Sequence, residues 1–396
     1  MPKYGLGSPV ISISFLALCL ALTGCAKSTV TSRFCPVSDI CGCGLPVSGA
    51  CHSNSVPLLF ATTTSNQILP FAISSSGALT ALPPSTGPAN SESISGAYGL
   101  MFADQSSDSV FSYTVNGATG ALTSVPGSPF SLGAANGGPT SIMVGPYAYL
   151  YATEPNGTIV GYGTTSQVDV LGAPLPGSPY AAGTAPSQMD FAANGDSGVF
   201  YLYASDPGDP NGGILAYSLD STGALTPVSG SPFPTLPGAQ PTVVRYGAFY
   251  QSLGSPVGSF LFVSLTAAAK VAVFSIDTST GILTPVPGSP FAVGNGPGML
   301  VEDDFNHLYV MNGADHTVSG FNVASNGVLT AIASPVPAGT ANGGMAYYPW
   351  NQLYVADTAS SAIVIFNLDQ ATGVLTQAGS AFAVTSPPLQ LAYVGP

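Results

Sequence analysis

The feature that most constrains this fold is a short motif that the chain repeats along most of its length. Residues 281–291 are GILTPVPGSPF, residues 223–233 are GALTPVSGSPF and residues 120–130 are GALTSVPGSPF. The first part, Gly-x-Leu-Thr, begins at Gly77, Gly120, Gly223, Gly281, Gly327 and Gly373, and a degenerate copy lies at Val170-Leu171. Seven copies spaced roughly 43 to 58 residues apart indicate a solenoid or a propeller.

Each copy predicts the same four short strands. In residues 297–336, apolar or aromatic runs lie at 298–301, 307–311, 317–323 and 328–332, separated by turns rich in Asp, Asn, Ser and Gly. Such runs indicate strands, and no segment shows a sustained helical period. A single blade has two apolar faces and needs a neighbour on each. The sequence therefore predicts an all-β chain folded as a seven-bladed β-propeller with four antiparallel strands per blade.

Both ends of the predicted ring meet in one blade. Residues 58–61 match the second strand of the other units, and residues 389–394 match the first. We expect the C-terminal strand to complete the first blade. Within the motif, Ile282-Leu283-Thr284 is expected to form the outermost strand, Gly288-Ser289-Pro290 to reverse the chain, and Phe291 to fill the gap between blades.

The N-terminus has the pattern of an export signal. Lys3 precedes an apolar stretch from Val10 to Leu22, which is too short to span a bilayer comfortably. Leu22-Thr23-Gly24-Cys25 resembles a bacterial lipobox, so residues 1–24 are predicted to be a lipoprotein signal peptide and Cys25 to carry the lipid. The alternative is an ordinary signal peptide with an incidental Cys. Ala26 after the Cys resembles the pattern for sorting to the outer membrane of a two-membrane bacterium.

Residues 25–56 are predicted to be a Cys-rich tether between the lipid and a propeller spanning residues 57–396. Outside the cytoplasm its four further cysteines are expected to form two disulfides of unassigned connectivity: Cys35, Cys41, Cys43 and Cys51. The alternative is a metal site that also uses His52, but the spacing matches no familiar zinc pattern.

Charge is scarce and mostly negative. The chain has 5 basic residues against 18 acidic ones, and only 6% of its residues are charged. Nucleic-acid binding depends on clustered Lys and Arg side chains that displace counterions from the phosphates. The sequence has no such basic patch, which argues against nucleic-acid partners. No cofactor motif is found, and we expect no cofactor.

Three segments, Leu-Tyr-Val-Ala-Asp (353–357), Val-Phe-Ser-Ile-Asp (273–277) and the Gly-x-Leu-Thr repeat, resemble the lactonase-like seven-bladed propeller family. That family includes the propeller type of 6-phosphogluconolactonase and YVTN-repeat surface proteins. The resemblance covers residues 57–396 and implies a ligand site at the mouth of the central channel. Fold alone does not fix activity.

Opening a lactone needs a base and a group that stabilises the oxyanion. Asp190 and Arg245 occupy equivalent, otherwise apolar positions in successive inner strands, where Met143, Val301 and Ala346 stand elsewhere. We expect the two to pair, either as part of a site in the channel or as an ion pair that fixes blade register. His316 lies in a loop on the predicted mouth side. Arg245, Asp190 and His316 are therefore the candidate catalytic residues.

Other polar residues have less specific patterns. Lys270, Asp104, Glu154, Asp206, Asp209 and Asp357 are placed on the same side as His316, and His307 in a surface turn. The segment Asp206–Gly212 could bind Ca²⁺ but lacks a closing Glu, which favours an acidic turn. Trp350 and Tyr348 could contact a glycan or cap the core of a blade.

These observations favour an exported, lipid-anchored propeller that binds a small molecule, a glycan or a protein at the channel mouth. The alternative is a lactone hydrolase resembling the propeller-type 6-phosphogluconolactonase. A carbohydrate-binding or adhesive surface protein is a third hypothesis. The shortage of cations argues against a phosphorylated substrate but not against a neutral lactone.

Overall fold

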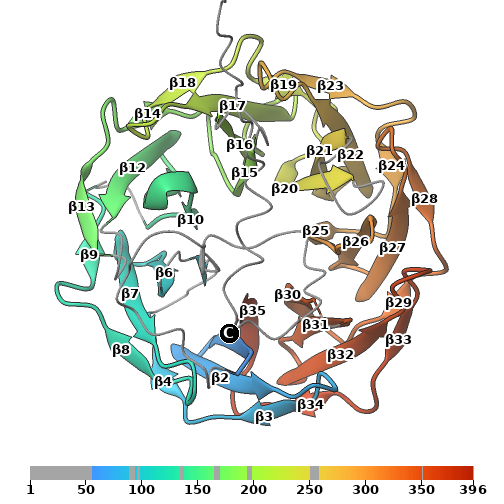
Figure 1. Cartoon of the computed structure of the whole chain (residues 1–396). Coiled ribbons are helices and arrows are strands. Elements are labelled where there is room, and N and C mark those ends of the chain that lie inside the picture. The colour runs from blue at the N-terminus through green and yellow to red at the C-terminus, as the bar shows by residue number, and fades with distance from the viewer. Residues whose placement is uncertain are drawn as a thin grey trace, which may run out of the picture.

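The protein is a seven-bladed β-propeller, seen in a computed structural model as a closed ring of sheets around a central axis (Figure 1). The structure describes residues 56–88, 94–95, 99–133, 138–164, 170–193, 199–249, 258–349 and 351–395. The predicted signal peptide, Cys25 and the Cys-rich tether up to residue 55 lie outside these residues. No helix within the described ranges is long and apolar enough to cross a membrane.

Each blade has four antiparallel strands, named here from the channel outward. Blade 1 consists of β35 (Pro388–Val394), β1 (Leu58–Thr63), β2 (Gln67–Ile73) and β3 (Leu79–Ala81). Blade 2 consists of β5 (Ile94–Ser95), β6 (Leu100–Asp104), β7 (Ser109–Val115) and β8 (Leu122–Ser124). Blade 3 consists of β10 (Ser141–Val144), β11 (Tyr149–Glu154), β12 (Thr158–Thr164) and β13 (Leu171–Pro174). Blade 4 consists of β15 (Met189–Ala193), β16 (Phe200–Asp206), β17 (Gly213–Leu219) and β18 (Leu225–Pro227).

The remaining blades follow the same order. Blade 5 consists of β20 (Pro241–Phe249), β21 (Gly258–Leu265), β22 (Lys270–Ile276) and β23 (Leu283–Pro285). Blade 6 consists of β25 (Pro297–Glu302), β26 (His307–Asn312), β27 (Thr317–Val323) and β28 (Leu329–Ala331). Blade 7 consists of β30 (Asn342–Tyr348), β31 (Gln352–Asp357), β32 (Ala362–Leu368) and β33 (Leu375–Gln377). Two single-turn 3-10 helices, Pro146–Ala148 and Thr266–Ala268, are the described helical segments.

The ring closes as the sequence predicts. β35, from the C-terminus, pairs antiparallel with β1, and Leu58 lies opposite Val394. The closing blade therefore contains strands from both ends of the chain (Figure 1). This arrangement confirms the prediction of a C-terminal strand in the first blade, and it leaves the inner edge of β1 covered.

The core consists of seven apolar clusters, one between each pair of neighbouring blades. The cluster between blades 4 and 5, for example, packs Tyr203 and Ile214 against Val263 and Phe274. The other interfaces have clusters of the same kind. Every blade is therefore buried on both faces by its neighbours, which explains why similar residues recur in all of them.

The Gly-x-Leu-Thr repeat joins neighbouring blades through a hydrogen bond. A buried Tyr in the second strand of one blade donates its hydroxyl to the carbonyl of the motif glycine in the next. Four interfaces have this bond: Tyr151 to Gly223 (2.7 Å), Tyr203 to Gly281 (2.8 Å), Tyr309 to Gly373 (2.9 Å) and Tyr354 to Gly77 (2.8 Å).

The motif position also requires glycine. Gly281 has φ +75°, a region that L-residues rarely adopt, and a Cβ there would lie 2.4 Å from the Tyr201 ring.

The segment that contains Gly-Ser-Pro-Phe in blades 2, 4 and 5, and Gly-Ser-Pro-Tyr in blade 3, extends the outer edge of the blade. Phe291 packs against the apolar cluster between blades 5 and 6, as predicted. With Ala292 it forms a two-residue strand, β24 (Phe291–Ala292), which pairs with β22 beyond the end of β23. Between these two outer strands, the Ser289 hydroxyl accepts the Val273 N–H at 2.9 Å. The same fifth strand recurs in every blade: β4 (Ser85–Thr86), β9 (Phe130–Ser131), β14 (Tyr180–Ala181), β19 (Phe233–Pro234), β29 (Val336–Pro337) and β34 (Phe382–Ala383).

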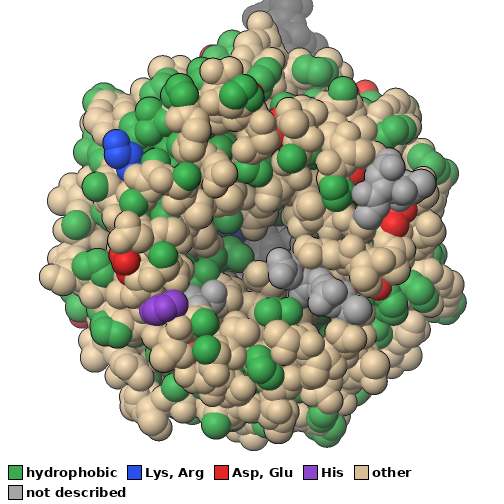
Figure 2. Space-filling view, turned by 180° about the vertical axis from the view of Figure 1, so that it is seen from behind, with side chains coloured by type: hydrophobic (Ala, Val, Ile, Leu, Met, Phe, Trp, Pro, Cys, Tyr) green, Lys and Arg blue, Asp and Glu red, His purple; other side chains and the backbone are tan. Residues whose placement is uncertain are grey.

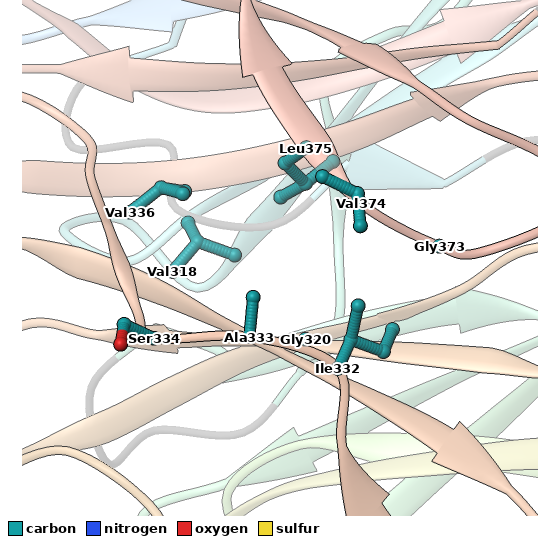
Figure 3. A pocket seen from close by; sticks show the side chains of 9 residues that line it. All are labelled: Val318, Gly320, Ile332, Ala333, Ser334, Val336, Gly373, Val374 and Leu375. Carbon is teal, nitrogen blue, oxygen red and sulfur yellow. The ribbon is translucent and has the colours of Figure 1, made fainter.

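One motif position departs from this pattern and leaves a cavity. In five blades the first residue of the fifth strand is Phe or Tyr, whereas blade 1 has Ser85 and blade 6 has Val336, which lies opposite Val318. A cavity of about 30 Å³ lies between blades 6 and 7, lined by Val318, Val336, Val374 and their neighbours (Figure 3). Val336, smaller than the aromatic residue at this position in five other blades, is one of the lining residues.

Candidate functional site

The inner strands of blades 4, 5 and 6 bring together three charged side chains near the axis. These strands, β15, β20 and β25, lie side by side around the centre of the ring (Figure 1). Viewed from behind, the molecule has a hollow at this centre, and charged side chains are sparse on the surrounding face (Figure 2). Asp190 is on β15, Arg245 on β20 and Glu302 at the end of β25.

Asp190 and Arg245 form the predicted pair. Arg245 Nη1 lies 3.7 Å from Asp190 Oδ2, and the Arg245 side chain is 46% exposed. Asp190 lies opposite Tyr203 and Arg245 lies opposite Phe262, and these two partners hold equivalent positions in the second strands of blades 4 and 5. Asp190 and Arg245 are therefore at the same height along the axis of the ring. Because β20 is the innermost strand of blade 5, this exposed side chain lies near the central channel.

Asp190 is held by the backbone as well as by Arg245. Its Oδ1 accepts the Phe191 N–H at 2.8 Å, and its Oδ2 accepts the Tyr246 N–H at 2.8 Å. Burial raises the pKa of Asp190, while Arg245 and these two N–H groups act in the opposite direction. The carboxylate therefore caps the free inner edge of β20 in addition to pairing with Arg245.

Glu302 is a third member of the cluster, and the sequence analysis did not find it. Burial raises the pKa of Glu302 well above its ordinary value, and Arg245 and the Ala248 N–H partly offset this rise. Gly247 provides the space, because a Cβ there would lie 2.5 Å from Glu302 Oε2. Glu302 ends an inner strand and begins the acidic run Glu302-Asp303-Asp304, which by sequence looks like an ordinary turn.

His316 lies apart from this pair. It is in the turn between β26 and β27, beyond the end of the strand that contains Tyr309, and its carbonyl accepts the Ala338 N–H at 2.9 Å. Its Nδ1 is buried without a hydrogen-bond partner in the described structure. The structure thus brings Asp190 and Arg245 together and places His316 at one end of blade 6.

His307 is not the surface residue that the sequence suggested. It is 3% exposed, and its Nδ1 lies 2.6 Å from Asp303 Oδ2. Asp303 also accepts the His307 N–H, which folds the ring into the interface with blade 7. Gly373 leaves room for the ring, because a Cβ there would lie 2.8 Å from it.

The acidic segment 206–212 uses its carboxylates within the protein. Asp206 accepts the N–H groups of Thr184 (2.8 Å) and Ala185 (2.9 Å), and Asp209 accepts that of Asn211 (2.8 Å). These bonds give the segment the structure of an acidic turn. No group of three or more His, Cys, Asp or Glu side chains in the described ranges is arranged to hold a metal.

The aromatic pair considered for glycan binding is only partly described. Tyr348 is 2% exposed and packs against Tyr393 with ring centroids 5.3 Å apart. It therefore belongs to the core between blades 7 and 1. Trp350 lies outside the described residues.

Comparison with known proteins supports the fold. No protein-family model matches the chain, and neither does any curated protein sequence. Solved structures do match. A proposed 6-phosphogluconolactonase from Bacteroides fragilis is 20% identical with a TM-score of 0.70, covering 88% of this chain and all of that one. The periplasmic gluconolactonase of Pseudomonas aeruginosa is 18% identical with a TM-score of 0.66, covering 86% of this chain and 99% of that one. At such identities the likeness establishes the fold alone.

Proposed function

We propose that this protein hydrolyses an uncharged lactone in its central channel. The observation that carries the proposal is the exposed Arg245 flanked by two carboxyl groups, Asp190 and Glu302, whose pKa values are both raised. A cation beside a carboxyl base is the minimal set for opening a lactone. The structural likeness to a periplasmic gluconolactonase supports the same class of reaction.

In the proposed hydrolysis, a carboxylate acts as the base and Arg245 stabilises the oxyanion. Water adds to the lactone carbonyl carbon while a carboxylate takes its proton, and Arg245 donates N–H groups to the oxyanion. Collapse of the adduct breaks the ring C–O bond, and the ring oxygen takes the proton back to give the open-chain hydroxy acid. Glu302 suits the role of base better than Asp190, because both oxygens of Asp190 already accept backbone N–H groups.

The charge of the cluster favours a neutral substrate. One guanidinium stands between two carboxyl groups, so the site offers no surplus positive charge to a phosphate. Among the described residues the other cation, Lys270, begins the third strand of blade 5 beside a turn. We therefore expect a sugar lactone without a phosphate group.

The test is a panel of uncharged and phosphorylated lactones, assayed with the purified full chain. We expect hydrolysis of the uncharged members, and Arg245→Gln is expected to lower kcat/KM by about 100-fold, as loss of one oxyanion donor does elsewhere. Lys270→Gln is the matched control, since it removes the same charge outside the channel. Activity that is equal in Arg245→Gln and wild type would contradict the proposal.

A second candidate function is ligand binding without turnover by a lipid-anchored envelope protein. The observation that favours it is the structural use of Asp190, which caps the backbone of β20. In this version Cys25 carries the lipid, the four tether cysteines form disulfides and a small molecule, glycan or protein binds at the channel mouth. Saturable lactone binding without hydrolysis would support it.

A further inference from the structure

In several blades the second strand ends on a polar side chain that binds backbone N–H groups nearby. Asp206 accepts the Ala185 N–H at 2.9 Å, Asp357 the Ala341 N–H at 3.1 Å, and Asn312 the Gly294 N–H at 3.1 Å. Asp104 accepts the Ser106 N–H at 2.9 Å. A polar group at this position is therefore normally satisfied within the blade.

Glu154 ends the second strand of blade 3 and is the exception. Its side chain is fully buried, at 0% exposure, and neither carboxylate oxygen has a hydrogen-bond partner in the described structure. A buried carboxyl without partners is costly, so a bound group that satisfies it would stabilise the fold.

A carboxyl group and a phenol interact electrostatically with Glu154. Asp108, in the turn between β6 and β7 of blade 2, interacts electrostatically with Glu154. Asp108 and Glu154 both interact electrostatically with Tyr162 of β12 and, with burial, raise its pKa. The Tyr162 hydroxyl donates a hydrogen bond to the Leu132 carbonyl. Burial, reinforced by Asp108, raises the pKa of Glu154 to about 8. Two carboxyl groups and a phenol therefore interact at the interface of blades 2 and 3.

We propose that Glu154 and Asp108 bind a calcium ion at this interface. Ca²⁺ prefers carboxylate and carbonyl oxygens and tolerates irregular geometry, whereas Mg²⁺ requires a near-ideal octahedron. Two carboxylates match the charge of a divalent ion. Since only two are present, carbonyl groups and water complete the shell, and the affinity is of the millimolar class found in extracellular modules, roughly 10⁻⁴–10⁻³ M. The site lies in blades 2 and 3, whereas Asp190, Arg245 and Glu302 lie in blades 4 to 6, and it does not depend on the proposed hydrolase activity.

The test is thermal unfolding of the full chain in EDTA and in about 5 mM CaCl₂, with MgCl₂ and NaCl at equal ionic strength as further arms. We expect Ca²⁺ to raise Tm by about 2–4 °C and the other salts to raise it less. Glu154→Gln should abolish the shift. Glu302→Gln, which alters the channel carboxyl, should keep it.

Two further measurements keep the test decisive where Glu154→Gln does not fold. Asp108→Asn should reduce the shift, and calorimetric titration of the wild type should find one Ca²⁺ site. No binding in the titration, an equal response to Mg²⁺ or Na⁺, or a shift retained in Glu154→Gln would overturn the proposal.

Discussion

The hydrogen bonds between blades give a direct prediction about stability. Tyr203 is fully buried, and its hydroxyl donates to the Gly281 carbonyl at 2.8 Å. Tyr203→Phe keeps the ring and its packing and removes only the donor. Gly281 would then have a buried carbonyl without its partner from the neighbouring blade.

The expected loss follows from that unpaired carbonyl. Leaving a buried acceptor unsatisfied costs about 1–3 kcal/mol, and because no cavity is created we expect the lower half of this range, about 1–2 kcal/mol. Tyr309→Phe should have a similar effect at the interface of blades 6 and 7, where the bond to Gly373 is 2.9 Å. The two sites share no partner, so the double variant should lose about the sum.

The assay is reversible urea unfolding followed by circular dichroism, with the slope compared between variants. Tyr113→Phe is the matched control. Its hydroxyl lies 3.5 Å from the Thr86 carbonyl, at the limit of a hydrogen bond, so its removal should cost well under about 0.5 kcal/mol. Tyr203→Phe could instead unfold at the same urea concentration as the wild type, or Tyr113→Phe could lose as much stability as Tyr203→Phe. Either result would show that the Tyr-to-Gly hydrogen bonds do not stabilise the contacts between blades.

Three further predictions concern the cavity, the ring closure and the channel. Val336→Phe should restore the missing aromatic ring, and filling a cavity of about 30 Å³ corresponds to about 0.7 kcal/mol of added stability in the same urea assay; a loss of stability would contradict this. A chain ending at residue 387 lacks β35 and leaves β1 uncovered, so it should aggregate rather than give a monomeric peak in size-exclusion chromatography. If Glu302 is the base, kcat/KM for an uncharged lactone should rise with pH through a value above the ordinary carboxyl pKa of about 4.3, because the raised pKa keeps Glu302 protonated at acidic pH. A profile that rises only through the ordinary carboxyl pKa, after subtraction of spontaneous hydrolysis, would exclude Glu302 from that role.

The fold was predictable from the sequence because each repeat contains its own strands and turns within a short stretch of the chain. Strands such as β26 and β31 have short apolar runs bounded by turns, and the C-terminal run matches the missing strand of blade 1. The two-residue fifth strands were missed, since Phe291 with Ala292 is too short to stand out as a strand. Likewise, the bond from Tyr203 to Gly281 joins residues 78 positions apart, and no local pattern indicates such a contact.

The candidate site was predictable only in part. Asp190 and Arg245 stood out because charges replaced apolar residues at equivalent positions, and the structure places them 3.7 Å apart. Glu302 lies one position later in its strand, within an acidic run that resembles a turn, so only the packing against Gly247 reveals it. His307 looked like a surface residue because nothing in the local sequence shows that Asp303 turns its ring inward.

The central functional claim is that the inner strands of blades 4, 5 and 6 bind an uncharged lactone. A crystal structure with a sugar lactam, which has the shape of the lactone but is not hydrolysed, tests this claim most directly. We predict that the lactam carbonyl oxygen lies about 3 Å from the Arg245 guanidinium, with Glu302 on the side from which water attacks. A lactam bound elsewhere on the ring, or in the channel without contact to Arg245, would contradict the account.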